Sequence, residues 1–223
     1  GFVNPGEIVA LPAVLGIDNH SEVLADFKKI LGAEVFEIAS LPPCVPGMRL
    51  NNKLVATAKN ERVDYVLGSK VTGCTVADGK VVSVTVGTAG AGKEIKADAV
   101  VLAGGGFESG ALKLDSHGHL HETILDLPVT MPEGVKEEDL IHGDYWGSPQ
   151  PLFLCGVEVD ETMLVTYQGK PVHSNVYAAG GVIAGATRWQ EKSGEGIALG
   201  SAIKAADAIL SSVGAGAATK ERN

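Results

Sequence analysis

An α/β fold built of two unequal lobes is what the amino-acid sequence predicts, and three observations support that prediction. Two apolar runs, at 98–107 and 175–181, contain glycine clusters at their ends, as buried parallel strands do where the backbone turns close to a ligand. Helical periodicity is present at 19–31 and again at 193–210. The 223 residues are enough for each lobe to bury a core, and the 29 glycines suit many tight turns.

The first part of the chain reads as strand, helix and strand, followed by a stiff loop. Residues 6–11 and 35–38 are short apolar runs, and they flank the helical pattern at 19–31. The proline-rich stretch 41–47 cannot hydrogen-bond regularly, so it is a candidate domain border. We therefore expect 1–46 to form part of a smaller α/β lobe, with a substrate-binding or accessory role.

The next segment, 47–107, is expected to hold a helix, a strand, an antiparallel β-meander and a glycine turn. Residues 48–59 predict the helix and 63–67 the strand. Alternating β-branched residues flank Asp78-Gly79, and this pattern is typical of a two-residue hairpin turn.

The sheet order follows from these elements. We expect 63–67, 98–103 and 175–179 to lie in one largely parallel sheet, with 69–88 as a separate antiparallel layer. The remaining segments are expected to be an insertion or lid at 108–150, the C-terminal part of the sheet domain with its closing helix at 151–213, and a frayed tail at 214–223.

Charge and cysteine content exclude several classes of function. A formal charge of −9 argues against a general role on nucleic acid or an anionic membrane. No apolar run approaches the roughly 20 residues needed to cross a bilayer, so direct membrane insertion is not expected. Cys44, Cys74 and Cys155 are far apart and form no CxxC pair, so neither a disulfide framework nor a cysteine metal site is indicated. A reducing cytosol fits best. Because the chain starts at Gly1 and runs directly into an apolar stretch, we expect it to be an excised piece.

Several motifs in fixed order carry a resemblance to a known family. They are DAVVLAGGGF at 98–107, NVYAAGGVIAG at 175–185 and SGEGIALGSAIKAADAIL at 193–210, and in this order they resemble the C-terminal half of flavoproteins of the fumarate reductase and succinate dehydrogenase type. More narrowly, SLPPCVPGMRLNNKL at 40–54, GDYWGSPQP at 143–151 and GVEVDETM at 156–163 are similar to the family of anaerobic glycerol-3-phosphate dehydrogenase B subunits. The likeness covers nearly all of 1–210.

This resemblance implies a Rossmann-like flavin-binding parallel sheet that is only partly present. The N-terminal strand–GxGxxG–helix that would hold the diphosphate is absent from this sequence, so we expect the piece alone to bind flavin weakly and to be inactive. Many relatives have an acidic residue where this chain has Gly181, which leaves the choice between FAD and FMN open. The expected cofactor-binding residues are Ala103, Gly104, Gly105, Gly106, Ala179, Gly180, Gly181, Gly194, Glu195, Gly196 and Ile197.

The start of the last helix has a separate physical argument for flavin. Its free amides and positive dipole end, at Gly196–Leu199, would stabilise negative charge on a reduced flavin. Glu195 would oppose that charge, so we expect its carboxylate to point away or to cap the helix.

The activity implied by the resemblance is oxidation of sn-glycerol 3-phosphate to dihydroxyacetone phosphate, with electrons passed towards quinone. The implied partners are other subunits of the dehydrogenase and a small phosphorylated substrate. The implied place is the cytoplasm, with attachment to the inner face of the cytoplasmic membrane through a partner subunit. Two alternatives stay open, because fold does not fix function: a non-catalytic electron-transfer or structural subunit, and another flavoprotein oxidoreductase of this type.

Three basic residues are candidates for the substrate phosphate. Arg188 lies in the loop between the last strand and the last helix, and it is the strongest candidate for an anion contact. Arg49 and Lys53 are four residues apart on one predicted helix face and could clamp a phosphate. The alternative for Arg49 and Lys53 is a solvated basic face, which is the more common arrangement.

Other candidates have equally ordinary explanations. His117, His119 and His121 alternate and could bind a metal on one face of a strand, but a solvated histidine cluster is favoured and no metal site is predicted. His142 beside Asp144 could transfer protons, although a surface turn is favoured. The two tryptophans, Trp146 and Trp189, could line a cleft or an interface, and packing is the default interpretation.

Overall fold

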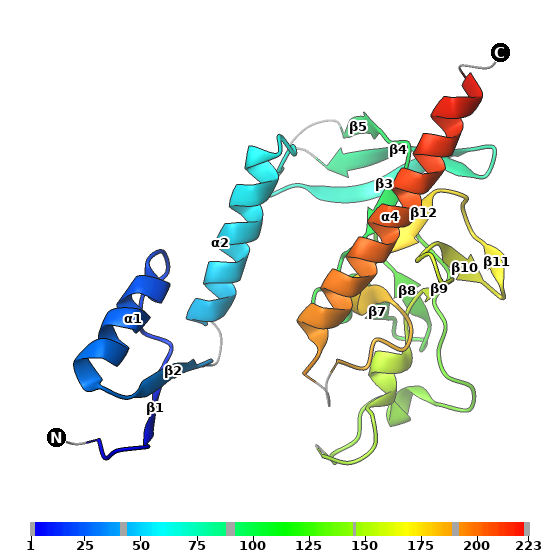
Figure 1. Cartoon of the computed structure of the whole chain (residues 1–223). Coiled ribbons are helices and arrows are strands. Elements are labelled where there is room, and N and C mark those ends of the chain that lie inside the picture. The colour runs from blue at the N-terminus through cyan, green and yellow to red at the C-terminus, as the bar shows by residue number, and fades with distance from the viewer. Residues whose placement is uncertain (1–2, 41–43, 88–91, 145, 189–191, 221–223) are drawn as a thin grey trace. The chain divides into compact units, whose positions relative to one another are not determined.

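The chain forms two compact units, Gly1–Gly68 and Ser69–Asn223, in a computed structural model that describes residues 3–40, 44–87, 92–144, 146–188 and 192–220 (Figure 1). Helices and several small sheets, some of them parallel, make up these units, which confirms the α/β class. The division falls at Gly68, inside the segment expected at 47–107. The expected domain borders, and the role expected for each segment, stay predictions.

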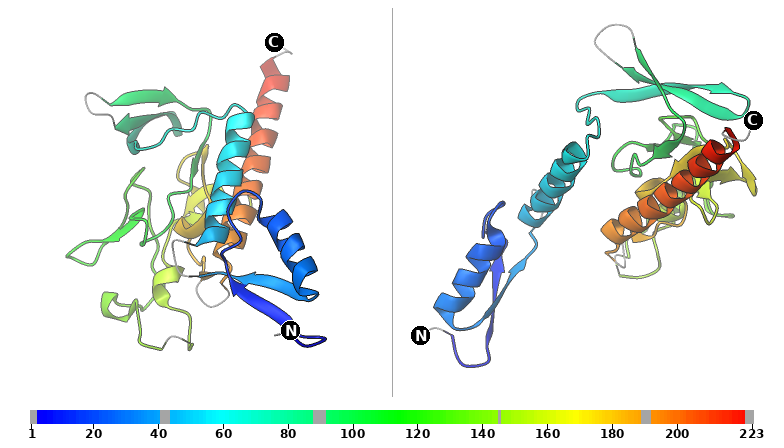
Figure 2. Two further views of the ribbon diagram at one scale, coloured as in Figure 1. Left: turned by 90° about the vertical axis from the view of Figure 1, so that its left-hand side faces the viewer. Right: turned by 45° about the horizontal axis from the view of Figure 1, so that its top comes forward.

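The first unit begins with a parallel strand pair and a helix. Strand β1 (Ile8–Pro12) pairs in parallel with β2 (Glu34–Ile38), and helix α1 (His20–Leu31) makes the crossover between them. In Figure 2, α1 lies along this two-stranded sheet, where its half-buried Leu24 and Phe27 belong to the apolar stripe seen in the sequence. The predicted strand, helix and strand are therefore confirmed.

Helix α2 (Val45–Asn60) completes the first unit. It starts at Val45 because Pro46, which has no N–H to donate, is tolerated only in the first turn. The helix predicted at 48–59 is confirmed.

The strand predicted at 63–67 is wrong. This segment is irregular, and Val63, Val66 and Leu67 are 54%, 63% and 74% exposed. An apolar run becomes a strand only when another strand accepts its backbone hydrogen bonds, and within the described residues this run has no such neighbour.

The second unit opens with a three-stranded antiparallel sheet. Strand β3 (Lys70–Ala77) pairs with β4 (Lys80–Gly87), which pairs in turn with β5 (Lys93–Lys96). The turn between β3 and β4 has Asp78 at φ 50° and Gly79 at φ 71°, as a primed hairpin turn requires. The predicted hairpin and separate antiparallel layer are confirmed, and β5 is an addition.

The strand that follows this antiparallel sheet along the chain belongs to a parallel pair. Strand β6 (Val100–Leu102) pairs with β12 (Val176–Ala178), with Val100 opposite Val176 and Leu102 opposite Ala178. This confirms the prediction that 98–103 and 175–179 share a parallel sheet. Buried Asn175 joins the pair to the antiparallel sheet: it accepts from the Val81 N–H at 2.9 Å and donates to the carbonyls of Val81 and Asp98 at 2.8 and 2.9 Å.

The second unit also contains several short elements. They are β7 (Leu112–Leu114) and β8 (Leu120–Glu122), η1 (Glu137–Asp139), η2 (Pro151–Leu154), the antiparallel strands β9 (Glu158–Val159), β10 (Val165–Tyr167) and β11 (Lys170–Pro171), and η3 (Gly180–Val182). The segment 108–150 also gives Leu112, Leu125 and Leu127 to the core. Its expected role as an insertion or lid stays a prediction.

One apolar core holds the second unit together. Its buried members come from β4, β6, β7, β10, β12, η3 and the loops between them: Val81, Leu102, Leu112, Leu125, Leu127, Val157, Val165, Val176, Ala178 and Val182. Glu122 is also buried, and its carboxylate accepts the backbone N–H groups of Ile124 and Leu125 at 2.7 and 2.8 Å. The core therefore packs against the strands whose ends form the site described below.

Helix α4 (Gly194–Lys220) closes the fold and lies alongside β12 (Figure 1). Its backbone stays helical to Lys220, beyond the predicted end at 210. The tail expected at 214–223 stays a prediction. Ser201 and Ala205 are buried against β12 and η3, whereas Leu199, Ile203 and Leu210 are exposed.

By length and composition alone, the part of α4 at Gly194–Val213 is long and apolar enough to cross a membrane. That criterion is weak support for a span, because core helices of soluble proteins also meet it. The absence of direct membrane insertion stays a prediction.

Candidate functional site

The carboxyl ends of β6 and β12 bring the two predicted glycine turns together. Parallel strands end at the same sheet edge, so Ala103–Gly106 and Ala179–Gly181 become neighbours. A Cβ placed on Gly106 would lie 3.1 Å from the Gly181 carbonyl oxygen, so the close approach of the turns favours glycine there. Gly105 and Gly180 have φ of 79° and 75°, a conformation that L side chains rarely adopt.

Arg188 lies against both turns. A Cβ on Gly181 would come within 2.7 Å of its Nη1 atom, and a Cβ on Gly106 within 3.0 Å of its Nη2 atom. The guanidinium therefore occupies the space that the two missing side chains leave. Only 18% of the Arg188 side chain is exposed.

Two further groups contact the Arg188 guanidinium. Glu108 pairs with it through a short contact between Nη2 and Oε1, and its own side chain is 61% exposed. The ring of Phe153 lies 5.0 Å from the guanidinium carbon, within reach of a cation–π interaction. Arg188 thus has a fixed place between a carboxylate, an aromatic ring and two glycine turns.

An open cavity of about 610 Å³ adjoins this cluster and reaches the beginning of α4. It is lined by Phe107, Glu108, Leu152, Phe153, Arg188, Lys192, Gly194 and Glu195. Three of these side chains are apolar and four are charged, and a site that combines an apolar wall with charged groups can bind a small molecule. The cavity can therefore accept a ligand with an apolar body and an anionic group that contacts Arg188.

The described part of the site contains most of the predicted cofactor-binding residues. The turns 103–106 and 179–181 meet, and Gly194 adjoins them because a Cβ there would lie 3.5 Å from the Arg188 Cδ atom. Glu195 and Gly196 are on the first turn of α4, where Gly196 is exposed, and Ile197 follows them. These residues fit the approach of a flavin along backbone, since side chains are missing where the two turns converge.

Ser201 is a site residue that the sequence analysis missed. Its Oγ accepts the N–H of Gly180 at 2.9 Å and donates to the Ile197 carbonyl at 2.5 Å. The hydroxyl therefore ties the second glycine turn to α4. A serine on the buried face of an alanine-rich helix was the only signal, and the residues that it joins are 21 positions apart.

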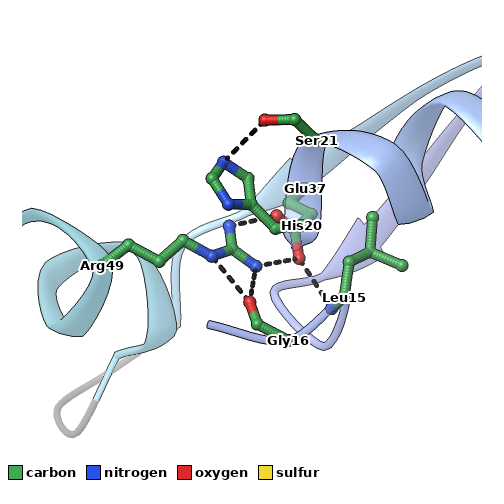
Figure 3. Close-up of polar contacts among 6 residues, drawn as sticks. All are labelled: Leu15, Gly16, His20, Ser21, Glu37 and Arg49. Atoms are coloured by element: carbon green, nitrogen blue, oxygen red, sulfur yellow. Dashed lines mark hydrogen bonds and ion pairs between the residues drawn. The ribbon is translucent and has the colours of Figure 1, made fainter. Parts of the chain in front are cut away.

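Arg49 forms an ion pair and hydrogen bonds within the first unit (Figure 3). It reaches from α2 to Glu37 on β2, with Nη1 to Oε2 at 2.5 Å and Nη2 to Oε1 at 3.1 Å, and it also donates to the Gly16 carbonyl. Both side chains of the pair are about nine-tenths buried, at 12% and 10% exposure.

The Arg49 hydrogen bond holds the pKa of Glu37 at about 2, and the Leu15 N–H adds to this effect. Arg49 therefore serves as a structural counter-ion in this unit. Lys53 is exposed on the same helix. A phosphate clamp formed by Arg49 and Lys53 stays a prediction, in which phosphate would compete with Glu37.

The histidines at 117–121 surround Asp115 in the β7–β8 hairpin. The Asp115 carboxylate accepts the backbone N–H groups of His119 and His117 and contacts the His121 Nε2 atom at 3.0 Å, and these contacts lower its pKa. Among the residues that the structure describes, no group of three or more His, Cys, Asp and Glu side chains is arranged to hold a metal ion.

The other sequence candidates are less closely tied to the cavity. Gln150 connects His142 to the Asp144 carbonyl, and the Asp144 carboxylate accepts the Trp146 N–H at 3.2 Å, as in a surface turn. Trp146 is 81% exposed. Trp189 lies outside the described residues.

The three cysteines are all unpaired, as the sequence indicated. Burial raises the pKa of Cys155 to about 11, so this thiol stays protonated near neutral pH and is a poor nucleophile.

Comparison with known proteins identifies the family. Residues 1–197 match the family described as "FAD binding domain". The chain belongs to this FAD binding domain family. The cofactor is thereby FAD rather than FMN, which resolves the alternative left by Gly181. No solved structure matches the chain.

Several curated relatives of this FAD binding domain chain are named as B subunits of an anaerobic glycerol-3-phosphate dehydrogenase. A protein of Halobacterium salinarum, named as the probable B subunit of an anaerobic glycerol-3-phosphate dehydrogenase, is 30% identical over 92% of the chain. A protein of Actinobacillus pleuropneumoniae, named as the B subunit of the same enzyme, is 30% identical over 90%, and one of Haemophilus influenzae with that name is 28% identical over 92%. The chain spans about half the length of these relatives, 46–47%.

Proposed function

We propose that this chain is part of a flavin-dependent dehydrogenase subunit that oxidises sn-glycerol 3-phosphate to dihydroxyacetone phosphate, with electrons passed towards quinone. The observation that supports the proposal is the position of Arg188, which lies between two glycine turns at the edge of a cavity in an FAD binding domain. The names of the relatives supply the substrate.

FAD would be held along the turns 103–106 and 179–181 and at the start of α4. When bound there, FAD supplies the acceptor for the hydride removed from the substrate carbon. Ser201 keeps the Gly180 amide in place, so the second turn keeps its left-handed conformation. The first amides of α4 would favour the negative charge of a reduced ring.

Arg188 would bind the substrate phosphate and orient its carbinol carbon. The guanidinium keeps its charge at any working pH and can make two parallel hydrogen bonds to one phosphate. Phe107, Leu152 and Phe153 line the same cavity and would exclude water from the three-carbon body of the substrate.

The proposal extends to partners and location. The relatives are named as B subunits, so we propose that this protein works with other subunits of a dehydrogenase complex. A cytoplasmic position at the inner face of the membrane, reached through a partner subunit, fits electron delivery to quinone. The charge of −9 supports the absence of nucleic acid among the partners.

The test is cofactor extraction and substrate-dependent bleaching of the full-length protein, with and without its partner subunits. We expect FAD at close to one per chain, and loss of its oxidised absorbance when glycerol 3-phosphate is added anaerobically. Glycerol without phosphate is the matched control and should not bleach the flavin. FAD that stays oxidised in the complete complex would rule out this substrate.

A further inference from the structure

Glu108 is the acidic partner of Arg188, and the two side chains are unequally exposed. Arg188 is 18% exposed, whereas Glu108 is 61% exposed at the rim of the cavity. Glu108 lies two residues after Gly106, which is the last residue of the first glycine turn. The buried member of the pair is therefore the cation, and the carboxylate reaches it from the solvent side.

The position of Arg188 does not depend on Glu108 alone. Phe153 stacks on the guanidinium, and the backbone at Gly106 and Gly181 lies against its nitrogen atoms. These contacts come from rigid backbone and from a ring that loses few rotamers. Removal of the Glu108 charge should therefore leave the guanidinium close to its present place.

Glu108 uses the same donor edge that an oxyanion would use. A carboxylate and a phosphate both bind guanidinium N–H groups, and here Glu108 occupies Nη2. Its negative charge also repels an incoming dianion. Ion pairs with one exposed member contribute little to stability, so the exchange of one oxyanion for another is inexpensive.

We propose that Glu108 is an exchangeable counter-ion that sets the anion affinity of this cavity. The carboxylate neutralises Arg188 when no ligand is bound, and it swings into solvent when the phosphate of a ligand takes its place. Glu108 is then a specificity-determining residue, because weakly anionic or neutral molecules cannot displace it. The inference rests on the proposed function in one respect, which is that Arg188 is the anion contact.

Other charged side chains of the cavity also affect its affinity for an anion. Lys192 and Glu195 also line it, so the charged lining among the described residues is two acidic and two basic side chains. A substitution at Glu108 alone isolates the contribution of the Arg188 partner. Glu161 provides a matched control, because it is an exposed glutamate of the same unit and lies outside this cavity.

The test is calorimetric titration of the full-length protein with inorganic phosphate. Glu108→Gln should tighten phosphate binding about fivefold, the upper end for an exposed charge pair. Glu161→Gln changes the net charge equally and should alter the dissociation constant by no more than about twofold. In an Arg188→Gln background, the gain from Glu108→Gln should vanish, since its partner is gone.

Phosphate affinity that is unchanged or weakened in Glu108→Gln would overturn the proposal, as would a gain that persists in the Arg188→Gln background. Lack of phosphate binding in every variant would also overturn it. A failed substrate assay has a different signature: the flavin is not bleached by glycerol 3-phosphate, while the phosphate titrations still show the coupling between Glu108 and Arg188.

Discussion

At the scale of single residues, Arg188 has the sharpest functional consequence. Arg188→Ala in the full-length complex should lower kcat/KM for glycerol 3-phosphate by about ten- to a hundredfold, because a charge-assisted bidentate contact is lost. Arg188→Lys should also reduce it, since an ammonium cannot reproduce the planar fork. Steady-state kinetics together with FAD content would measure this.

The FAD content should stay nearly unchanged in both variants. Lys170→Ala, at an exposed position on β11, is the control for loss of one positive charge. Wild-type kcat/KM in Arg188→Ala would remove this residue from the substrate site and direct attention to Arg49 and Lys53.

Glu37 gives a prediction about pH. Its pKa in the folded chain is lowered to about 2 by Arg49, whereas an unpaired glutamate titrates near 4.5. The pair therefore stabilises the fold fully above pH 4.5, and this stabilisation is lost as the pH falls from about 4.5 to 2. The difference in unfolding temperature between wild type and Glu37→Gln should shrink over that window.

Circular dichroism melts at a series of pH values would record this difference. Glu34→Gln is a suitable comparison, because Glu34 lies on the same strand and its ion pair with Lys28 is exposed. A difference between wild type and Glu37→Gln that stays constant from about pH 6 to about pH 2 would contradict the assigned role.

At the scale of elements, Asn175 joins the parallel strand pair to the antiparallel sheet by bonding Val81, which is 94 positions away in sequence. Asn175→Ala removes two buried hydrogen bonds and one partly buried one, and it leaves the Val81 N–H and two carbonyls without their partner. We expect a loss of about 2–4 kcal/mol in the free energy of unfolding, measured by urea titration. Ser174→Ala, at the neighbouring position, should cost less than about 0.5 kcal/mol.

The elements that could be predicted from sequence are those whose cause is local. The hairpin follows from Asp78-Gly79, because two residues with positive φ make the turn. Helices α1 and α2 follow from apolar spacing. Pro46 was expected in the loop 41–47 but lies in the first turn of α2. By contrast, 63–67 has strand composition, but a strand also needs a neighbour, and no local pattern encodes one.

Long-range contacts account for what the sequence could not reveal about the site. The glycine turns were predicted because both follow apolar runs. The partner of Arg188 was not, since Glu108 is 80 residues away in sequence, and Asn175 meets Val81 across 94 residues. Strand β5 was missed because all four of its residues are exposed and polar residues dominate it.

At the scale of the whole molecule, the sequence lacks a GxGxxG segment, although the chain belongs to an FAD binding domain family. Dinucleotides are held largely by the strand–turn–helix that carries this segment. We therefore expect the 223-residue chain, purified alone, to be colourless and inactive. Absorbance at the flavin bands and cofactor extraction measure this directly.

A yellow preparation with stoichiometric FAD would contradict that expectation, and it would mean that the turns at 103–106 and 179–181 hold the cofactor unaided. The full-length protein, purified in parallel, is the positive control.

The bond from the Gly180 amide to Ser201 also bears on how the site opens. Both groups are buried, and Ser201 is anchored in turn to the Ile197 carbonyl. Deuterium can replace the Gly180 amide proton when local opening breaks its bond to Ser201 on α4. The exchange rate of this amide proton therefore reports the free energy of opening the contact between α4 and the second glycine turn. We expect ligands that bind at the start of α4 to slow the exchange as their occupancy rises.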